Sequence, residues 1–192
     1  MADIALATRP AHTAEARDRL RVIIDDKSLL KGGFKLSSGQ QTDYFFNMKM
    51  TMLDPEGSNL IADAILDLLQ DEQNLGSLGG MALGAVPIVA VVCSKSHLRG
   101  APVQVFFVRN DPKQHGTRQQ IEGYITQGSR VILVDDVTTT GGSVMKAVRA
   151  ARDVGCKVDT VITVVDRLEG AKENLAKEGI RLVPLYTRRD FE

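Results

Sequence analysis

The segment 135–143 combines residue types that together can bind a phosphorylated sugar. Two acidic residues, Asp135 and Asp136, follow the apolar run 131–134, and hydroxyl residues and glycines come next. The residues expected to hold a phosphate are Thr138, Thr139, Thr140, Gly141, Gly142 and Ser143. Glycines let backbone N–H groups close on phosphate oxygens, and a helix N-terminus adds unpaired donors and a partial positive charge. Because carboxylates can hold a cation or sugar hydroxyls, the segment predicts an acidic site beside a phosphate site.

The chain around this segment alternates between short apolar runs and helical patterns, which is typical of βαβ units and a parallel sheet. The runs predicted as strands are 78–83, 103–108, 131–134, 158–165 and 180–185. The helices between them are expected to begin near Pro87, Ser143 and Ala171, and Gly155 is the expected end of the second. Ligands of open α/β sheets bind beyond the carboxyl ends of the strands, which is where segment 135–143 lies.

The N-terminal part of the chain predicts a helix followed by a hairpin. Apolar residues at helical spacing indicate a helix over 13–27, and a polar stretch between two β-favouring runs indicates a hairpin over 34–46. Asp54-Pro55-Glu56 is a helix start, with a capping carboxylate and a proline at the first helical position. We expect one domain over 1–192, with the helix and hairpin in 1–52 and an α/β core in 53–192.

Composition excludes several classes of protein. The 192 residues include 24 basic and 24 acidic side chains, so the formal net charge is zero, and a main role on nucleic acid or an anionic membrane is not expected. The longest mostly apolar run, 81–93, is too short to span a bilayer, and the N-terminus lacks the pattern of a signal peptide. Cys93 and Cys156 are far apart and predict buried thiols of a cytoplasmic protein, without a disulfide framework or structural zinc.

Segment 135–143 looks like the phosphoribosyl-diphosphate signature of the type I phosphoribosyltransferases. Three further parts of the chain resemble the orotate phosphoribosyltransferases within that family. Residues 108–123 resemble their mobile catalytic loop and the strand after it, 34–47 resemble their base-binding hairpin, and 166–170 resemble their D-R-x-E-G loop. The glycine motifs of nucleoside-triphosphate and dinucleotide sites are absent from the sequence, so such sites are not expected.

The resemblance, which extends from about Ile23 to Phe191, implies both a fold and an activity. The implied fold is an α/β type I phosphoribosyltransferase core, a central mostly parallel sheet flanked by helices, with a small N-terminal hood. The implied reaction moves ribose 5-phosphate from 5-phosphoribosyl 1-diphosphate to orotate, forming orotidine 5′-monophosphate and pyrophosphate in pyrimidine synthesis, with Mg²⁺ as cofactor. It also implies a homodimer in which each catalytic loop reaches the neighbouring subunit's site.

The resemblance assigns roles to charged residues near the diphosphate. Arg109, Lys113 and His115 would neutralise or protonate the leaving diphosphate. Asp135 and Asp136 would orient ribose hydroxyls and, directly or through water, a Mg²⁺ bound mainly by the diphosphate. Catalysis by such a site is positioning together with neutralisation of the leaving group.

The resemblance assigns a second set of residues to the base. Arg167 would bind the carboxylate of orotate, because a guanidinium fork matches that geometry, and a surface ion pair with Glu169 is the alternative. Thr139 would hydrogen-bond the base. Phe45 and Phe46 would offer a ring face or backbone atoms to it, with core packing as the alternative. Lys49 would lie near the base or diphosphate, or would simply be solvated.

Three positions depart from the better-known bacterial pattern, and two other functions stay open. Ser37 and Asn110 replace lysines, and no lysine stands near Gly84. A phosphoribosyltransferase for another base would need no carboxylate partner such as Arg167. A regulator that senses phosphoribosyl diphosphate and binds nucleic acid would need a basic surface or a DNA-binding appendage, whereas the N-terminal residues here predict a hairpin.

Overall fold

The centre of the molecule is a four-stranded parallel sheet in the order β3-β6-β7-β8. The computed structural model describes residues 13–35, 41–110 and 120–192. The strands of the sheet are β3 (Leu75–Gly80), β6 (Arg130–Thr138), β7 (Lys157–Asp166) and β8 (Arg181–Thr187). All four carboxyl ends therefore lie at one edge of the sheet, where the sequence predicts the site.

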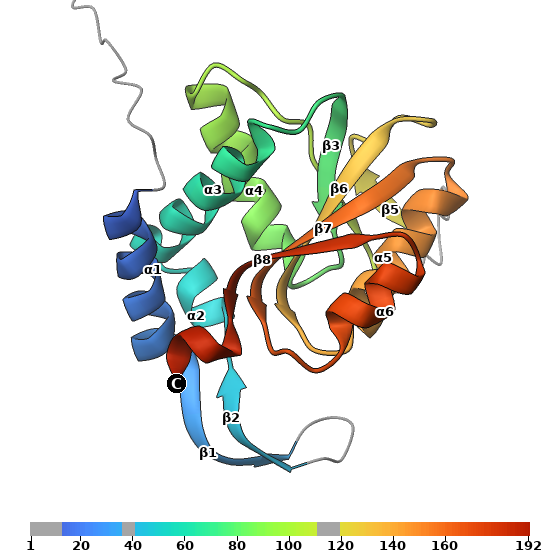
Figure 1. The fold of residues 1–192 in the computed structure, drawn as a ribbon. Helices are drawn as coiled ribbons and strands as arrows, with labels where there is room; N and C mark the ends of the chain where they lie inside the picture. The colour runs from blue at the N-terminus through green and yellow to red at the C-terminus, as the bar shows by residue number, and fades with distance from the viewer. Residues whose placement is uncertain (1–12, 36–40, 111–119) are drawn as a thin grey trace, which may run out of the picture.

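Helices cover both faces of this sheet (Figure 1). On one face lie α1 (Ala14–Lys27), α3 (Pro55–Leu69) and α4 (Ala85–Leu98), and on the other lie α5 (Gly142–Asp153) and α6 (Ala171–Lys177). Both faces of the sheet are apolar because successive side chains along a strand point to opposite faces. Ile132 and Val134 pack with the first group of helices, whereas Val131 and Leu133 pack with the second. The expected α/β architecture is confirmed.

The N-terminal hairpin projects from one end of the sheet (Figure 1). It consists of β1 (Leu29–Lys35) and β2 (Gln41–Phe46), which pair antiparallel and are followed by the short helix α2 (Lys49–Met52). The hairpin begins earlier than the sequence predicts, because pairing continues back to Leu29, which lies opposite Phe46. The ring of Phe46 packs against Phe191 of the C-terminal 3₁₀ helix η1 (Arg188–Phe191), with ring centroids 5.3 Å apart. This contact fixes the base of the hairpin on the core.

Helix starts were predictable because capping is local. Thr13 caps α1 by accepting a hydrogen bond from the N–H of Ala16, and Asp54 caps α3 by accepting one from the N–H of Gly57 at 2.9 Å. Helix α5 ends at Asp153, and Gly155 follows it with φ +84°. That left-handed conformation is one that glycine adopts without a steric penalty.

Two strand predictions were wrong in their bounds. The predicted strand 78–83 is β3, Leu75–Gly80, because its pairing with β6 ends where Gly80 meets Val134. Of the predicted strand 103–108, only β4 (Phe106–Val108) is regular, and it pairs antiparallel with β5 (Ile121–Gly123). Isolated bridges from Val105 and Val108 connect this small sheet to the β3 side of the main sheet.

The third error concerns the strand that leads into the site. The predicted strand 131–134 is β6, Arg130–Thr138, so Asp135 and Asp136 lie within a strand and not in the loop after it. The strand continues because β7 runs alongside it, with Val137 opposite Val165 and Thr138 opposite Asp166. The predicted strands 158–165 and 180–185 are likewise β7 and the slightly later β8.

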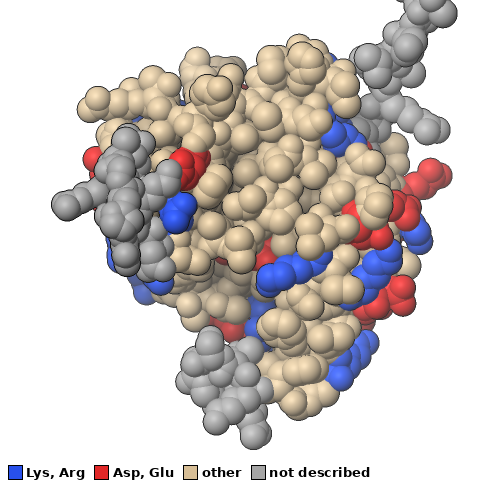
Figure 2. Space-filling view, turned by 180° about the vertical axis from the view of Figure 1, so that it is seen from behind, with Lys and Arg blue, Asp and Glu red and all other residues tan. Residues whose placement is uncertain are grey.

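Charge on the molecular surface is mixed. Figure 2 shows that the face seen from behind is mostly uncharged, and that basic and acidic side chains are interspersed along one flank of it. Within the described part of the chain, no helix has the length and apolar character needed to cross a bilayer.

Candidate active site

The acidic pair lies in the last part of β6, at the carboxyl edge of the sheet. The side chain of Asp135 is almost fully buried, and Asp136 is partly buried beside it. Burial, together with the neighbouring Asp136 carboxylate, raises the pKa of Asp135 from its usual acidic value to about 8. Burial also raises the pKa of Asp136, and the positive charge of Lys49 opposes that shift. Two carboxylates in this position cost stability and favour a bound cation or hydrogen-bond donor.

The backbone of Gly84 closes one side of this pair. A Cβ atom at position 84 would lie 2.5 Å from Oδ1 of Asp136, which is closer than such contacts occur in proteins, and a tight 3.3 Å from Oδ1 of Asp135. Glycine is therefore needed here for close approach, since its φ of −58° is open to any residue. The backbone at Gly84 therefore lies directly against the carboxylates.

A cleft of about 380 Å³ opens over the acidic pair. Its charged and polar lining comes from four separate elements: Lys49 of α2, Asn110 after β4, Asp135 and Asp136 of β6, and Ser143 of α5. Main-chain segment 81–84, between β3 and α4, completes it. We call this the acidic cleft. The structure thus brings the predicted residues Lys49, Asp135, Asp136 and Ser143 together.

The turn from β6 into α5 has the form of an anion cradle. Thr138 ends the strand, Gly141 has φ +85°, and α5 begins at Gly142. The first N–H groups of a helix have no partner within the helix, so they are free to face a ligand. Among the described residues, Oγ1 of Thr138 is buried without a hydrogen-bond partner. The side chain of Asn174 on α6 donates to the carbonyl of Thr140 at 3.0 Å and so holds the turn in place.

Arg167 follows β7 and points toward the N-terminal hairpin. Its side chain is 4% exposed, so it is not the surface residue that one alternative predicts, although it does pair with Glu169 at 2.7 Å. Its Nε donates to Oη of Tyr44 at 3.3 Å, and its Nη2 donates to Oγ1 of Thr42 at 3.5 Å. The guanidinium carbon lies 4.7 Å from the centre of the Tyr44 ring. We call Thr42, Tyr44, Arg167 and Glu169 the arginine cluster.

Three further predicted residues, Phe45, Phe46 and Arg109, lie in the described part of the chain but belong to neither group. The ring of Phe46 is buried in the core, so only its backbone is available to a substrate, whereas Phe45 is partly exposed and packs beside Phe34. Arg109 lies at the end of β4 and forms an ion pair with Glu122 at 3.7 Å. Lys113 and His115, like Ser37, lie outside the described residues.

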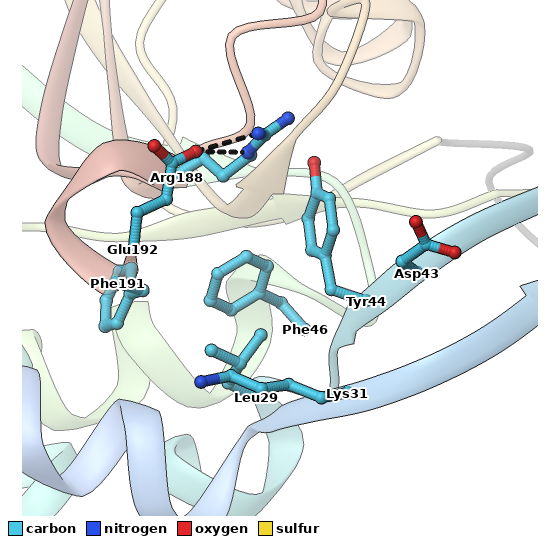
Figure 3. A pocket seen from close by; sticks show the side chains of 8 residues that line it. All are labelled: Leu29, Lys31, Asp43, Tyr44, Phe46, Arg188, Phe191 and Glu192. Atoms are coloured by element: carbon cyan, nitrogen blue, oxygen red, sulfur yellow. Dashed lines mark hydrogen bonds and ion pairs between the residues drawn. The ribbon is translucent and has the colours of Figure 1, made fainter.

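A second cleft, of about 260 Å³, lies between the hairpin and the C-terminal helix η1 (Figure 3). Tyr44, Phe46 and Phe191 form its aromatic wall, and Arg188 pairs with Glu192 at its rim. It contains none of the residues of the acidic cleft. Its wall does include Tyr44, whose ring stacks on Arg167. This second cleft therefore lies where the hairpin packs against the core.

The donor set of the acidic cleft fits a cation that brings most of its own ligands. Among the described residues, no group of three or more His, Cys, Asp or Glu side chains is arranged to hold a metal ion. Two buried carboxylates supply the negative charge for Mg²⁺, which commonly keeps several waters and takes phosphate oxygens from its substrate. The residues therefore fit a metal that enters with a phosphorylated ligand.

Sequence reasoning overlooked the residues that hold others in place. Tyr44 and Thr42 contact Arg167 from another part of the chain, and Asn174 supports the phosphate turn from α6. For Tyr44 a signal existed, since strand alternation places it on the opposite face of the hairpin from Phe45. Nothing in the local sequence marks Asn174.

Comparisons with known proteins agree with this geometry. The profile of the phosphoribosyl transferase domain matches residues 55–183. Orotate phosphoribosyltransferase of Bradyrhizobium diazoefficiens is 44% identical over 180 residues, which is 92% of this chain and 96% of that protein. The enzyme of the same name from Aquifex aeolicus is 43% identical over 173 residues, covering 88% of this chain and 94% of that protein.

A solved structure is similar as well. The crystal structure of Mycobacterium tuberculosis orotate phosphoribosyltransferase in complex with 5-phospho-α-D-ribosyl 1-diphosphate superposes with a TM-score of 0.77. It is 33% identical to this chain and covers 92% of it, and the chain covers 98% of that structure.

Proposed function

Because this chain belongs to the orotate phosphoribosyltransferase family, we propose that it transfers ribose 5-phosphate from 5-phosphoribosyl 1-diphosphate to orotate. The C–O bond to the diphosphate breaks, a bond forms from the anomeric carbon to a ring nitrogen that gives up its proton, and pyrophosphate leaves. The products are orotidine 5′-monophosphate and pyrophosphate, which places the chain in pyrimidine synthesis. The observation that carries the proposal is the acidic cleft, in which Asp135, Asp136 and Ser143 converge with Lys49.

The phosphoribosyl half of the substrate is assigned to the acidic cleft and the turn beside it. Backbone N–H groups of the turn and the hydroxyls of Thr138, Thr139, Thr140 and Ser143 would hold the 5-phosphate, with Gly141 and Gly142 allowing close approach. The unpartnered hydroxyl of Thr138 supports this role. Asp135 and Asp136 would accept hydrogen bonds from the ribose hydroxyls, which fixes the anomeric carbon for attack.

The main obstacle to the reaction is charge separation, because the negatively charged diphosphate must leave a carbon that becomes oxocarbenium-like. Arg109, Lys113 and His115 are the proposed cationic and proton-bearing groups, and Lys49 supplies a further positive charge in the cleft. We propose Mg²⁺ as the cofactor, held mainly by the diphosphate and through water by Asp135 and Asp136. When bound, Mg²⁺ would offset the diphosphate charge that these carboxylates would otherwise oppose.

The base is assigned to the arginine cluster and the neighbouring hairpin. Arg167 would bind the carboxylate of orotate, Thr139 would hydrogen-bond the ring, and Phe45 would offer its partly exposed ring. The backbone of Phe46 would complete this side, since its ring packs in the core. A desolvated guanidinium gains more from a carboxylate than a solvated one, which supports Arg167 as the group that selects orotate.

The state of the protein in the cell is part of the same proposal. We propose a homodimer with shared sites, because family resemblance assigns the catalytic loop to the neighbouring subunit's site. A cytoplasmic location is supported by the two free thiols, Cys93 and Cys156. The contacts between Phe46 and Phe191 support treating the hairpin and core as one domain.

The test is an assay of purified protein with phosphoribosyl diphosphate and Mg²⁺ that follows the loss of orotate absorbance. Parallel reactions contain uracil, hypoxanthine, xanthine or adenine, and a second series replaces Mg²⁺ by a chelator. We expect turnover of orotate alone, and only with the metal. Turnover of another base in place of orotate would overturn the role of Arg167, and binding of phosphoribosyl diphosphate without transfer would favour a sensor.

A further inference from the structure

Tyr44 makes more polar contacts than a residue that only packs the hairpin needs. Its hydroxyl accepts a hydrogen bond from Nε of Arg167 and donates one to Oε1 of Glu169, each at 3.3 Å. Two guanidinium groups also lie over its ring, that of Arg167 at 4.7 Å and that of Arg188 at 5.2 Å from the centre. A cation over an aromatic face is attracted most strongly where water is excluded, as it is around Arg167.

These contacts use some donors of Arg167 and leave others. Nε is directed to Tyr44, and Nη2 is directed to Glu169 and Thr42. Among the described residues, Nη1 has no hydrogen-bond partner. The described contacts therefore hold the guanidinium group by one edge and one face, and we assign the donors of Nη1 to the ligand. A free arginine side chain would lose considerable conformational entropy on reaching the same arrangement.

Tyr44 is itself held by aromatic rings of the core. Its ring meets the buried ring of Phe46 edge-on with centroids 5.8 Å apart, and Phe46 packs on Phe191. Figure 3 shows Tyr44 standing beside Phe46, with Arg188 and Glu192 nearby. Arg188 pairs with Glu192 at 2.7 Å, so its charge is balanced there. The tyrosine is thus fixed to the core before any substrate is present.

We infer that Tyr44 is a positioning residue that determines affinity for the carboxylate-bearing base by presetting the Arg167 guanidinium. The inference rests on the proposed function, in which Arg167 binds the carboxylate of orotate. Tyr44 acts through Arg167 by stacking and by the Nε hydrogen bond, and the substrate meets the donors that remain. A donor that is already in position loses less entropy when the ligand binds. Tyr44 therefore increases the affinity for orotate and does not change the affinity for phosphoribosyl diphosphate.

The experiment measures kcat and the KM values of both substrates for Tyr44→Leu and Tyr44→Phe. Loss of the ring and hydroxyl in Tyr44→Leu raises the KM for orotate about tenfold, while kcat and the KM for phosphoribosyl diphosphate stay within about twofold. Tyr44→Phe keeps the ring and so restores most of the affinity, with a KM for orotate about two- to threefold above wild type. Tyr124→Leu, at an exposed tyrosine after β5, is the matched control and changes neither KM.

A double-mutant cycle separates positioning from structure. In an Arg167→Lys background, Tyr44→Leu adds less than about twofold to the KM for orotate, because the group that it positions is gone. Tyr44→Phe keeps this test open if Tyr44→Leu fails to fold. An undiminished effect of Tyr44→Phe or Tyr44→Leu in the Arg167→Lys background would overturn the inference, as would an unchanged orotate KM in Tyr44→Leu itself.

The same KM values separate a failure of the proposed role of Arg167 from a failure of the positioning role of Tyr44. If Arg167→Lys alone leaves the KM for orotate unchanged, the proposed role of Arg167 fails and the positioning role of Tyr44 fails with it. If Arg167→Lys raises that KM and Tyr44→Leu does not, the proposed function stands and only the role of Tyr44 is lost.

Discussion

The acidic cleft and the arginine cluster lie at the same edge of the sheet but are built in opposite ways. In the acidic cleft, burial raises the cost of ionising both Asp135 and Asp136, and the neighbouring carboxylate of Asp136 raises it further for Asp135. In the arginine cluster, the buried charge of Arg167 is already balanced by Glu169 and stacked on Tyr44. The cleft therefore needs an incoming cation or donor, whereas the cluster is prepared in advance.

This difference separates two tasks of one reaction. In the proposed function, the acidic cleft binds the phosphoribosyl part of the substrate, and the cost of holding two buried carboxylates is relieved only in the complex. The arginine cluster is proposed to recognise the base, and its geometry would then have to be correct before binding. Substitutions in the cleft should therefore affect reactions with any base, and substitutions in the cluster should affect the choice of base.

The largest effect is expected at Lys113, which lies outside the described residues. If the cleft and cluster supply binding and Lys113 lowers the barrier, Lys113→Ala reduces kcat by about 10³-fold or more. The dissociation constant of orotidine 5′-monophosphate, measured by calorimetry, should change much less. Equal losses in kcat and product affinity would assign this lysine to general binding and would weaken the division of tasks.

The next largest effect is expected for Asp136→Asn in the acidic cleft. Asparagine keeps the shape of the side chain but removes the charge proposed to orient ribose hydroxyls and water bound to Mg²⁺, so kcat/KM should fall about 10²- to 10³-fold. The orotate KM should change by less than about threefold, which steady-state rates with both substrates varied will show. A loss confined to the orotate KM would contradict the assignment of this residue to the phosphoribosyl half.

A stability effect is expected for Asp135→Asn in metal-free buffer. The folded pKa of Asp135 is raised above the unfolded value of about 3.9, so the folded state binds the proton more tightly and wild type loses stability as pH rises from about 4 to 8. Asparagine removes this loss, and the variant should be more stable by on the order of 2 kcal/mol at pH 8. Thermal unfolding followed from pH 5 to pH 8 measures it, with Asp159→Asn on the surface as control. A variant less stable than wild type at pH 8 would mean that ionised Asp135 does not destabilise the folded protein.

The smallest effect is expected for Arg130→Gln, at the opposite end of β6. Arg130 bridges Glu72 and Asp159 in a partly exposed ion-pair network, and such pairs contribute about 0–1 kcal/mol. Urea unfolding should show a loss in that range, and kcat and both KM values should stay within about twofold of wild type. A tenfold change in activity would show that the site responds to changes anywhere in the sheet. It would contradict the assignment of separate tasks to the cleft and the cluster.

The cleft could be predicted from the sequence much better than the cluster. Its acids, hydroxyls and glycines are contiguous in segment 135–143, and the strand before them and helix after them follow from local apolar patterns. Even so, β6 extends to Thr138, because strand length is set by the partner strand β7 and not by the local run of apolar residues. Gly84 and Lys49 join the cleft only through tertiary folding.

The cluster depends on contacts between distant segments. Arg167 could be identified from its motif. Thr42 and Tyr44 contact it from the hairpin, and the spacing of residues in the sequence does not show that these segments meet. The same limit applies to Phe46, which was expected near the base and whose ring packs in the core against Phe191. Local signals identify residues that meet a ligand, whereas the residues that hold them are identified by the fold.

The most direct test of the division between cleft and cluster is the affinity for phosphoribosyl diphosphate, measured by titration calorimetry with Mg²⁺. Three proteins suffice: wild type, Asp136→Asn and Arg167→Lys. We expect Arg167→Lys to bind within about threefold of wild type, and Asp136→Asn to bind at least about tenfold more weakly. An equal loss in both variants would show that cleft and cluster act as one site and would contradict the account.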